Sequence, residues 1–599
     1  MLSTSKRPRE LRWFHAGPML FGDWGTSRLY VLGLAFFYTQ GASLWFMGAM
    51  CVLLLAVAWA YQIVCRTHPD GGGVYSSAKH FSQTLAVIGA LMLCADYLIT
   101  AALSSLDAFH YLDVPHPQWW AAGSILLIGF INFFGPRKGG TLALVIALLT
   151  VGLTLVVVGG AVPSLGSAHV TAPKGGPLQW WAQFTALILA ISGVEAIANM
   201  TGIMVKPVER TSRYSILPVV AEIVILNIVL TVAMSAIPLD FLGGGDQAAA
   251  YSAHRDDMLR AMAEYYIGPK FAAVSSLVFA LLLLSAANTA ITDLVSIQFM
   301  LSRDRELPPA FGVLNEWGMP VLSLLVAAVA PAVIVLLVPD VGALAHLYAI
   351  GVAGAVAINL CTTSTNKTLS IRRWERYVML GIGVFMVAAW VTIAYEKPQA
   401  LAFAVTIMAL GLIARLGARH RAKVRGWLVR VAHIPALAPT APASAPALAP
   451  MAVSNGIRPR PTFPTRTLVP TRGNPKLIRY ALEQARLQGG EVLFLFVRHI
   501  AVATMGSFRA ADPTADPEAA ALFEAIRRDA ETAGVKANCL YAVAWDVADA
   551  ILEFAVTHGV DTLLLGATQR STFWHMMKGD VTREVAEYLP ENITLLFHA

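Results

Sequence analysis

The chain has 599 residues, of which 56% are hydrophobic and 14% are charged, and its mean hydropathy is +0.61. A soluble domain averages roughly 45–50% apolar and about 25% charged residues, so this composition excludes a wholly soluble protein. The net charge of +7 then favours basic loops beside a membrane over a surface for nucleic acid. Five cysteines without a CxxC pair favour buried thiols over a disulfide framework or a zinc site.

Twelve apolar segments are predicted to cross a membrane, each near the roughly 20 residues that a spanning helix needs. They cover 17–40, 43–65, 83–112, 119–135, 141–162, 181–204, 215–238, 271–300, 320–338, 341–362, 374–394 and 398–416. Lys and Arg concentrate in alternate loops, at Arg66, Arg137 and Arg303 for example. With an even number of spans this bias places both termini in the cytoplasm. We therefore expect a multi-pass protein of the cell (inner) membrane.

The predicted organisation has four parts. Residues 1–16 form a cytoplasmic N-terminus and residues 17–416 the membrane domain, an all-α bundle. Residues 417–465 are basic and rich in Pro and Ala, which is typical of a linker. Residues 466–599 alternate strands and helices, with strands expected at 466–470, 491–497, 537–543, 561–566 and 593–598. This alternation predicts a doubly wound parallel sheet.

Two of the apolar segments carry residues that interrupt a membrane helix. The first reads Gly-Asp-Trp-Gly-Thr-Ser-Arg-Leu-Tyr-Val over 22–31, and the sixth reads Ser-Gly-Val-Glu over 192–195. Glycine is a poor helix former, and Ser and Thr compete for backbone hydrogen bonds, so we expect both helices to break. The breaks lie five segments apart. This placement predicts a 5+5 inverted repeat with the substrate site at the breaks.

Three acids lie inside predicted spans: Asp23 in the first, Asp96 in the third and Glu195 in the sixth. An acid in the membrane costs roughly 2.5–3.5 kcal/mol on insertion scales, so three of them need a common reason. Thr100 and Ser104 follow Asp96 at i+4 and i+8, which puts three oxygen-bearing side chains on one helix face. The functional interpretation is a path for a cation. The alternative is that each acid is structural and satisfied by an arginine or a backbone amide.

Two hydroxyl groups accompany the breaks. Tyr30 lies seven residues after Asp23, and Ser192 lies three residues before Glu195. Alone, each is typical of an ordinary buried side chain. Beside a break, carboxylates, hydroxyls and the carbonyls of 26–27 offer the oxygens that a weakly hydrated monovalent cation requires. A carboxylate there repels the carboxylate of a zwitterion, so the pattern favours a cation or a cationic solute, and a desolvated carboxyl group can also take up a proton.

Other charged residues of the predicted spans are not assigned to the cation site. Asp293 in the eighth segment is expected to be structural, Asp107 interfacial, and Glu222 has no predicted role. Arg28 follows the first break and offers Asp96 a possible partner. Pairing of those two side chains is the main structural alternative for Asp96.

The membrane domain resembles the amino acid–polyamine–organocation superfamily over about 17–416. The general similarity lies in Pro-Asp-Gly-Gly-Gly-Val-Tyr at 69–75, Gly-Val-Glu-Ala at 193–196 and Ser-Arg-Asp-Arg-Glu-Leu-Pro at 302–308. Segment 22–31 further resembles the Gly-Asp-Ile-Gly-Thr-Ser-Pro-Leu-Tyr signature of the KUP potassium transporters, with Trp24 and Arg28 as departures. Within that family the pattern is most similar to the KimA-type branch.

This resemblance implies a LeuT-like bundle that takes up potassium with high affinity, coupled to protons, by alternating access. The implied site for potassium and for proton coupling comprises Asp23, Tyr30, Asp96, Thr100, Ser104, Ser192 and Glu195. All of these except Asp96 are implied ligands of the ion itself. The family has threonine where Ser192 stands, so the hydroxyl group is kept. Potassium and the proton are then substrates, and no cofactor is expected.

The C-terminal region resembles the universal stress protein fold. That family's nucleotide motif is Gly-x2-Gly-x9-Gly-(Ser/Thr), whereas this chain has Gln569 for the second glycine and Asp580 for the hydroxyl residue. In KimA-type proteins the resemblance implies a regulatory domain that binds cyclic di-AMP and supports a homodimer. Candidate nucleotide contacts lie near strand ends, where ligands bind such sheets, at Thr471, Arg472, Gly566, Thr568, Arg570 and Ser571. The alternative is a domain that dimerises and binds nothing.

Three other functions compete with potassium uptake. A proton-coupled amino acid or polyamine permease shares the fold, and a cationic amino acid would also be attracted by Asp23 and Glu195. A membrane sensor would use the C-terminal domain for signalling. An integral membrane enzyme is disfavoured because the membrane segments contain no candidate arrangement of nucleophile and base.

Overall fold

The computed structural model describes residues 11–69, 71, 73–134, 140–243, 247–315, 317–419, 466–500, 516–544, 547–566, 581–590 and 593–598. The chain divides into two compact units, a helical unit that ends at Ala418 and a second unit that begins at Arg419. Each unit is described by itself below. The predicted N-terminal residues 1–10 and most of the predicted linker, 420–465, lie outside the described residues.

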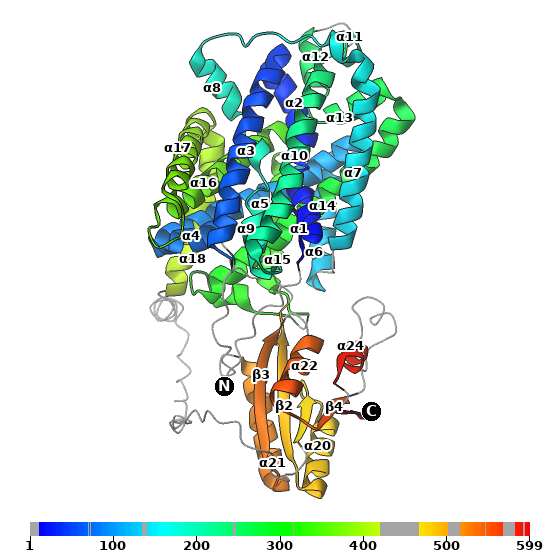
Figure 1. Ribbon diagram of the computed structural model, residues 1–599, viewed down its shortest axis with the longest axis vertical. Coiled ribbons are helices and arrows are strands. Elements are labelled where there is room, and N and C mark those ends of the chain that lie inside the picture. The colour runs from blue at the N-terminus through cyan, green and yellow to red at the C-terminus, as the bar shows by residue number, and fades with distance from the viewer. Residues whose placement is uncertain are drawn as a thin grey trace, which may run out of the picture. The chain divides into compact units, whose positions relative to one another are not determined.

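The helical unit begins with ten helices and short 3₁₀ turns that alternate along the chain. They are α1 (Trp13–Trp24), α2 (Ser27–Thr39), η1 (Gln40–Ala42), α3 (Ser43–Thr67), α4 (Val74–Lys79), α5 (Gln83–Tyr111), α6 (Pro117–Phe133), α7 (Gly140–Ala161), η2 (Val162–Ser167), α8 (Pro177–Thr185), η3 (Ile188–Ile191), α9 (Ala196–Met200), η4 (Thr201–Ile203) and α10 (Val208–Ser235). Figure 1 shows the longer of them, α3, α7 and α10 among them, side by side.

The unit continues with three short helices and five long ones. They are α11 (Leu239–Gly243), α12 (Gln247–Ala253), α13 (Met258–Tyr266), α14 (Pro269–Arg303), η5 (Pro309–Gly312), α15 (Val321–Leu337), α16 (Val341–Thr365), α17 (Arg373–Glu396) and α18 (Pro398–Arg419). Helix α5 lies at the centre, where it packs against α14, α16, α6 and α15. It is the most deeply buried of the apolar helices, so the predicted third span forms the core of the bundle.

Each of the twelve predicted spans coincides with a helix or with a pair of interrupted helices. By length and apolarity alone, eight helical stretches of the described residues are able to cross a membrane, or nine if the bent pair 177–185 and 188–200 is one span. The first stretch, Trp13–Thr67, has 55 residues and contains α1, α2 and α3. At 1.5 Å per residue, that is too long for one crossing of a hydrocarbon core about 30 Å thick. The multi-pass helical fold is confirmed, and the count of twelve and the inverted repeat stay predictions.

The interruption in the first span is short. Helix α1 ends at Trp24 and α2 begins at Ser27, and the two intervening residues, Gly25 and Thr26, keep right-handed helical dihedral angles. The Gly25 N–H still donates to the Phe21 carbonyl, at 2.8 Å. The chain therefore leaves the helical pattern for two residues without a sharp change of direction.

The interruption in the sixth span is larger. After α8 the chain forms the 3₁₀ turn η3, then four residues of turn over 192–195, and then the short helix α9. Helix α8 and the following stretch 188–200 differ in direction by 46°. Gly193 has a φ of +92°, a conformation that side-chain-bearing residues rarely adopt, so this glycine permits the turn.

The second unit contains one sheet of five parallel strands. They are β1 (Arg466–Pro470), β2 (Glu491–His499), β3 (Ala537–Ala544), β4 (Thr562–Gly566) and β5 (Thr594–His598), in the order β3-β2-β1-β4-β5. All four pairings are parallel, Leu468 with Leu493 and with Leu563 among them. The chain order reverses between β1 and β4, which is where ligands bind in doubly wound sheets.

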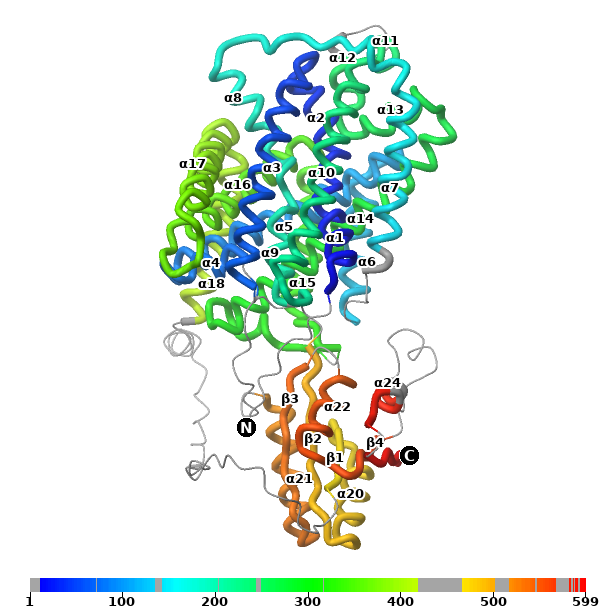
Figure 2. Tube along the Cα trace, in the orientation of Figure 1, coloured from blue at the N-terminus to red at the C-terminus, as the bar shows by residue number. Residues whose placement is uncertain are grey.

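Helices cover both faces of this sheet (Figure 2). One face packs against α20 (Pro475–Gln488) and α21 (Pro517–Ala533), and the other against α22 (Val547–Thr557) and α24 (Val581–Tyr588). Neighbouring β1 residues face opposite ways, Val469 to the first pair of helices and Leu468 to the second. The predicted doubly wound α/β fold is confirmed.

Candidate functional site

The last turn of α1 is capped by the side chains that follow it. Three carbonyl groups each accept a hydrogen bond from the side chain three residues on: Asp23 from Thr26 (2.5 Å), Trp24 from Ser27 (2.8 Å) and Gly25 from Arg28 (3.0 Å). The Thr26 carbonyl, proposed above as a cation ligand, accepts from the Leu29 N–H at 2.9 Å. The backbone of the break is thus satisfied locally, and the Asp23 side chain, 5% exposed, supplies its charge.

The two interruptions lie against each other. A Cβ atom added to Gly193 would lie 2.7 Å from the Trp24 nitrogen and 3.0 Å from the Asp23 carbonyl carbon. Real Cβ atoms do not approach backbone that closely, so only glycine fits. Segments 170 residues apart in the sequence therefore form one site, with Asp23 on one side and Glu195 on the other.

Asp96 brings the third acid to this site from α5. Its side chain is fully buried, and neither carboxyl oxygen has a hydrogen-bond partner among the described residues. Glu195, 4% exposed, accepts the Gly193 N–H on Oε1 at 3.2 Å, while its Oε2 has no such partner. The Asp96 and Glu195 carboxyl groups lie within electrostatic range of each other. Their proximity is favourable only if one of them carries a proton or a cation lies beside them.

The predicted hydroxyl groups are all buried, but they differ in their contacts. Ser192 is 2% exposed and its Oγ has no partner among the described residues. Thr100 donates to the Asp96 carbonyl at 2.9 Å and also lies beside the Asp96 carboxyl group. Tyr30 lies near Thr26 and within electrostatic range of Asp23 and Asp96. Ser104, 1% exposed, is two turns further along α5, and no described interaction joins it to the acids.

The structure adds residues that sequence reasoning missed. Asp293 of α14, expected to be structural, lies within electrostatic range of Asp23 and Glu195. Tyr348 of α16 lies within range of all three predicted acids. Tyr97 accepts a hydrogen bond from Asn199 at 2.8 Å and lies near the same acids. In the sequence, Tyr97 could have been noticed because it is next to Asp96, and Asp293 because it is an acid within a predicted span. No feature of the sequence marks Tyr348 as part of the site.

The structure also bears on the expectations for Arg28 and Asp107. Arg28 pairs with Glu222 of α10, at 2.7 and 2.5 Å, and not with Asp96. Asp107, expected near the interface between membrane and water, is fully buried within the protein, and neither of its carboxyl oxygens has a hydrogen-bond partner among the described residues. The alternative in which Arg28 satisfies Asp96 is therefore wrong.

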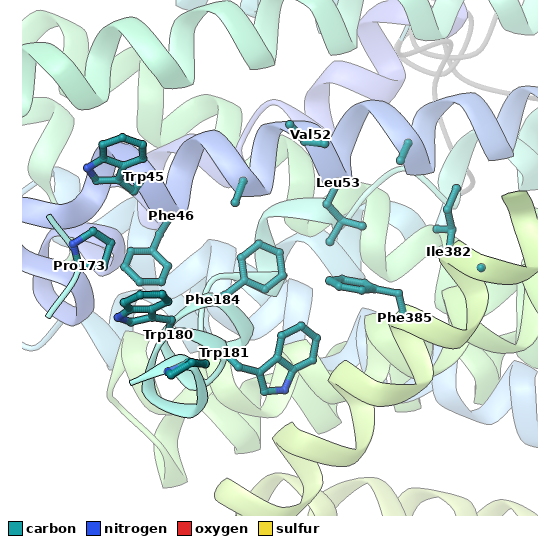
Figure 3. A pocket seen from close by; sticks show the side chains of 14 residues that line it. Trp45, Phe46, Val52, Leu53, Pro173, Trp180, Trp181, Phe184, Ile382 and Phe385 are labelled. Carbon is teal, nitrogen blue, oxygen red and sulfur yellow. The ribbon is translucent and has the colours of Figure 1, made fainter. Parts of the chain in front are cut away.

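A groove of about 840 Å³ lies away from the acids, between α3, α8 and α17. Figure 3 shows aromatic side chains converging on it, including Trp45, Trp180, Trp181 and Phe385. The indole N–H of Trp181 is already bonded to Thr392 at 2.7 Å, and that of Trp180 to the Lys174 carbonyl at 3.1 Å. This apolar lining offers no oxygen ligands for a cation, which favours the buried acids as the substrate site.

In the α/β unit, three of the six predicted nucleotide contacts can be placed. Thr471 and Arg472 follow β1, and Gly566 ends β4, so all three lie at the carboxyl ends of the two strands where the chain order reverses. Thr471 accepts the Gly473 N–H at 3.1 Å. The predicted contacts Thr568, Arg570 and Ser571 lie outside the described residues.

A polar cluster joins the end of β2 to the start of α21 and to β3. Arg498 forms two hydrogen bonds with Asp516, at 2.8 and 2.6 Å, and a third contact with Glu518 at 2.7 Å. The Tyr541 hydroxyl donates to Asp516 at 2.9 Å. Burial opposes ionisation of Asp516, but the hydrogen bonds from Arg498 and Tyr541 outweigh it and lower the pKa of this carboxyl group. The cluster is fully paired and ties the start of α21 to the sheet.

Buried acids on interrupted helices, inside a bundle of apolar helices, define a membrane transporter rather than an enzyme. The chain belongs to the amino acid permease family, which matches residues 11–414. The universal stress protein family matches residues 466–595.

Part of the chain is also similar to one characterised transporter. The potassium transporter KimA of Bacillus subtilis (strain 168) is 26% identical over 293 residues, 44% of this chain and 45% of the relative. The match thus spans less than half of that protein's length. The family, the C-terminal domain and this relative together support the predicted similarity to KUP/KimA-type transporters with a universal-stress-protein-like domain.

Two solved universal stress protein structures are similar to part of the chain. One, in complex with cAMP, is 18% identical and covers 22% of this chain and 96% of that chain, at a TM-score of 0.18. The other, from Archaeoglobus fulgidus, is 19% identical and covers 22% of this chain and 92% of that chain, also at a TM-score of 0.18. At that score neither bears on function.

Proposed function

We propose that this protein takes up potassium with high affinity by proton-coupled symport and alternating access. The observation that carries the proposal is the contact between the two interrupted helices, which gathers Asp23, Asp96 and Glu195 out of water. Buried polar groups are normally hydrogen-bonded, and unpartnered carboxyl oxygens are costly unless a ligand completes them. A potassium ion fits these oxygens, and KimA, the relative at 26% identity, is a potassium transporter.

In this proposal potassium and a proton are the substrates. The ion sheds water onto Asp23, Tyr30, Thr100, Ser104, Ser192 and Glu195, the first four on α1, α2 and α5 and the last two in the interrupted sixth span. The neighbouring carboxyl groups of Asp96 and Glu195 suit a proton on one of them, because two like charges close together out of water do not both stay ionised. Proton coupling thus has a place next to the ion.

Alternating access then moves the interrupted helices against the rest of the bundle. With both termini in the cytoplasm and the protein in the cell (inner) membrane, the inward-negative potential draws the ion inward. That driving force is about 2.3 kcal/mol per charge for each 100 mV.

The C-terminal unit is proposed as a cytosolic regulatory domain that binds cyclic di-AMP and supports a homodimer. The support is the position of Thr471, Arg472 and Gly566 at the carboxyl ends of β1 and β4. Calorimetry on the full chain in detergent, titrated with cyclic di-AMP and separately with ATP, tests the ligand. Heat with cyclic di-AMP alone supports the proposal, and no heat with either nucleotide removes it.

The second candidate is a proton-coupled amino acid or polyamine permease. It is favoured by the description of the family that matches residues 11–414. The acids at the breaks count against a zwitterion, but they would also attract lysine or a polyamine.

Rubidium uptake into potassium-starved cells separates the two candidates. We expect uptake that potassium competes and that lysine and putrescine do not. Competition by lysine or putrescine would establish the permease instead. In proteoliposomes, an internal rise in acidity that requires external potassium or rubidium would establish the proton as co-substrate, and ion uptake without it would remove proton coupling.

A further inference from the structure

Arg28 places a positive charge close to the proposed cation site. Its side chain is fully buried in the first turn of α2. Asp23 lies five residues earlier, which is about 7.5 Å along a helix axis. At that separation an unscreened charge in a protein interior acts strongly on a second charge. An unpaired guanidinium here would oppose both burial and the binding of a cation.

Glu222 of α10 forms an ion pair with Arg28. Its two carboxyl oxygens accept from the two terminal nitrogens of Arg28, at 2.7 and 2.5 Å. This bidentate geometry is the strongest that a carboxylate and an arginine can form. The remaining Nε–H donates to the Gly25 carbonyl at 3.0 Å, inside the break, and the guanidinium lies 5.3 Å from the centre of the Phe21 ring. Arg28 is therefore fixed between the break and α10.

We propose that Glu222 is the counter-ion that neutralises Arg28 and so sets the affinity of the first break for its cation. The inference rests on the proposed cation transport. Both residues act as positioning residues, because Arg28 touches the backbone of the break, Glu222 acts through Arg28, and neither is a proposed ligand of the ion. Helix α10 packs against both α1 and α3, so the pair also connects the break to its surroundings.

A second ion pair of the bundle supplies a matched control. Arg415 of α18 hydrogen-bonds Glu306, and it also donates to Thr84 at 3.0 Å. Both partners are buried, at 6% and 4% exposure. Thr84 precedes Asp96 by twelve residues in the same helix α5, about 18 Å along its axis. This pair has the same chemistry as Arg28–Glu222 but lies far from the break.

The test is the rubidium concentration that half-saturates uptake. Glu222→Gln keeps the shape and removes the negative charge, and we expect it to raise that concentration about tenfold, as a net positive charge near the site would. Arg28→Gln alone should raise it less than twofold. The double variant should return it to within about threefold of the wild type. Glu306→Gln should change the amount of protein in the membrane but not the half-saturating concentration.

Glu222→Asp covers the case in which Glu222→Gln does not fold. It keeps the charge with a shorter reach, and a half-saturating concentration near that of the wild type supports charge compensation. Three results overturn the inference. In the first, Glu222→Asp raises the half-saturating concentration as much as Glu222→Gln does. In the others, Arg28→Gln raises it as much as Glu222→Gln, or the double variant does not return it towards the wild-type value. Each presupposes rubidium uptake by the wild type, whose absence would instead remove the proposed function.

Discussion

The buried acids of the two units have opposite surroundings. Asp516 in the α/β unit accepts from Arg498, from Tyr541 and from the N–H groups of Glu518 and Ala519. Asp96 in the helical unit is more deeply buried, yet neither of its carboxyl oxygens has a partner among the described residues. A carboxylate that serves stability is surrounded by donors, whereas one left without them is suited to bind something that the fold does not supply.

Within the helical unit, too, some acids have a cationic partner and others do not. Glu306 and Glu222 each face an arginine, Arg415 and Arg28 respectively. Asp23, Asp96 and Glu195 face one another instead. Burial in the bundle therefore does not mark the substrate site, since paired and unpaired acids share it. Among the described residues, none of these three acids has an arginine or lysine partner, and this absence, together with the contact of two interrupted helices, distinguishes them.

Removing a charge from the three acids that have no arginine or lysine partner among the described residues should have the largest effect. Asp23→Asn keeps the size of the side chain, and we expect the ratio of maximal rate to half-saturating concentration for rubidium to fall at least about a hundredfold, as for loss of a buried charge partner. The measurement is rubidium uptake normalised to protein in the membrane. Asp113→Asn, at a side chain that is 75% exposed, is the control and should leave uptake unchanged. Full uptake by Asp23→Asn would contradict the site.

The contact between the breaks should be the next most sensitive feature. Gly193→Ala adds a Cβ that clashes with the backbone of Trp24 and requires an unfavourable φ. We expect about tenfold lower uptake per protein molecule, because a strained backbone costs on the order of 1–3 kcal/mol. Gly152→Ala in α7, where the added atom meets nothing within 4 Å, is the matched control. Equal uptake by the two variants would show that the close contact is dispensable.

Asp293 tests whether the cluster extends beyond the three predicted acids. It lies within electrostatic range of Glu195 and Asp23 but has no described hydrogen bond to either. We expect Asp293→Asn to change the half-saturating rubidium concentration about three- to fivefold, less than Asp23→Asn, because interactions at longer range are weaker. Glu264→Gln on the exposed side of α13 serves as the control. An effect as small as that of the control would assign Asp293 to structure.

The paired acid of the α/β unit should affect stability more than uptake. Asp516→Ala removes the partner of Arg498 and the cap of α21, and we expect a loss of about 2–4 kcal/mol. Hydrogen exchange of residues 516–533 in the full chain measures it, with exposed Asp529→Ala as the control, expected within about 0.5 kcal/mol. Exchange in this helix that does not change would show that the cluster adds no stability.

The same cluster predicts a dependence on pH. The pKa of Asp516 is lowered in the folded chain, since the bonds from Arg498 and Tyr541 outweigh its burial. The stability that ionised Asp516 contributes to the folded chain is therefore present above the pKa of an unfolded aspartate, about 4, and is lost as the pH falls below that value. Exchange of 516–533 should accelerate below about pH 4 in the wild type and depend less on pH in Asp516→Ala. Equal acceleration in both proteins would contradict this assignment.

Much of the fold could be predicted from local patterns. All five strands of the C-terminal unit were predicted within about two residues, because their apolar runs and the glycine or proline residues near their ends define them. The interruptions at 22–31 and 192–195 were also predicted, since glycine and hydroxyl residues weaken a helix wherever they occur. The 46° bend between 177–185 and 188–200 was not predicted, because the direction of a helix depends on what packs against it.

By itself the sequence determined the class of protein, the α/β fold of its C-terminal unit and the acids that contradict an apolar surrounding, because composition and local periodicity carry that information. Only the tertiary structure decided which acids are paired. Arg28 is 194 residues from Glu222, Glu195 lies within electrostatic range of Asp96, 99 residues away, and Gly193 contacts the first break across 170 residues. Hydrogen bonding and electrostatics act through space, so a list of charged residues becomes a set of pairs and an unpaired site only once the chain has folded.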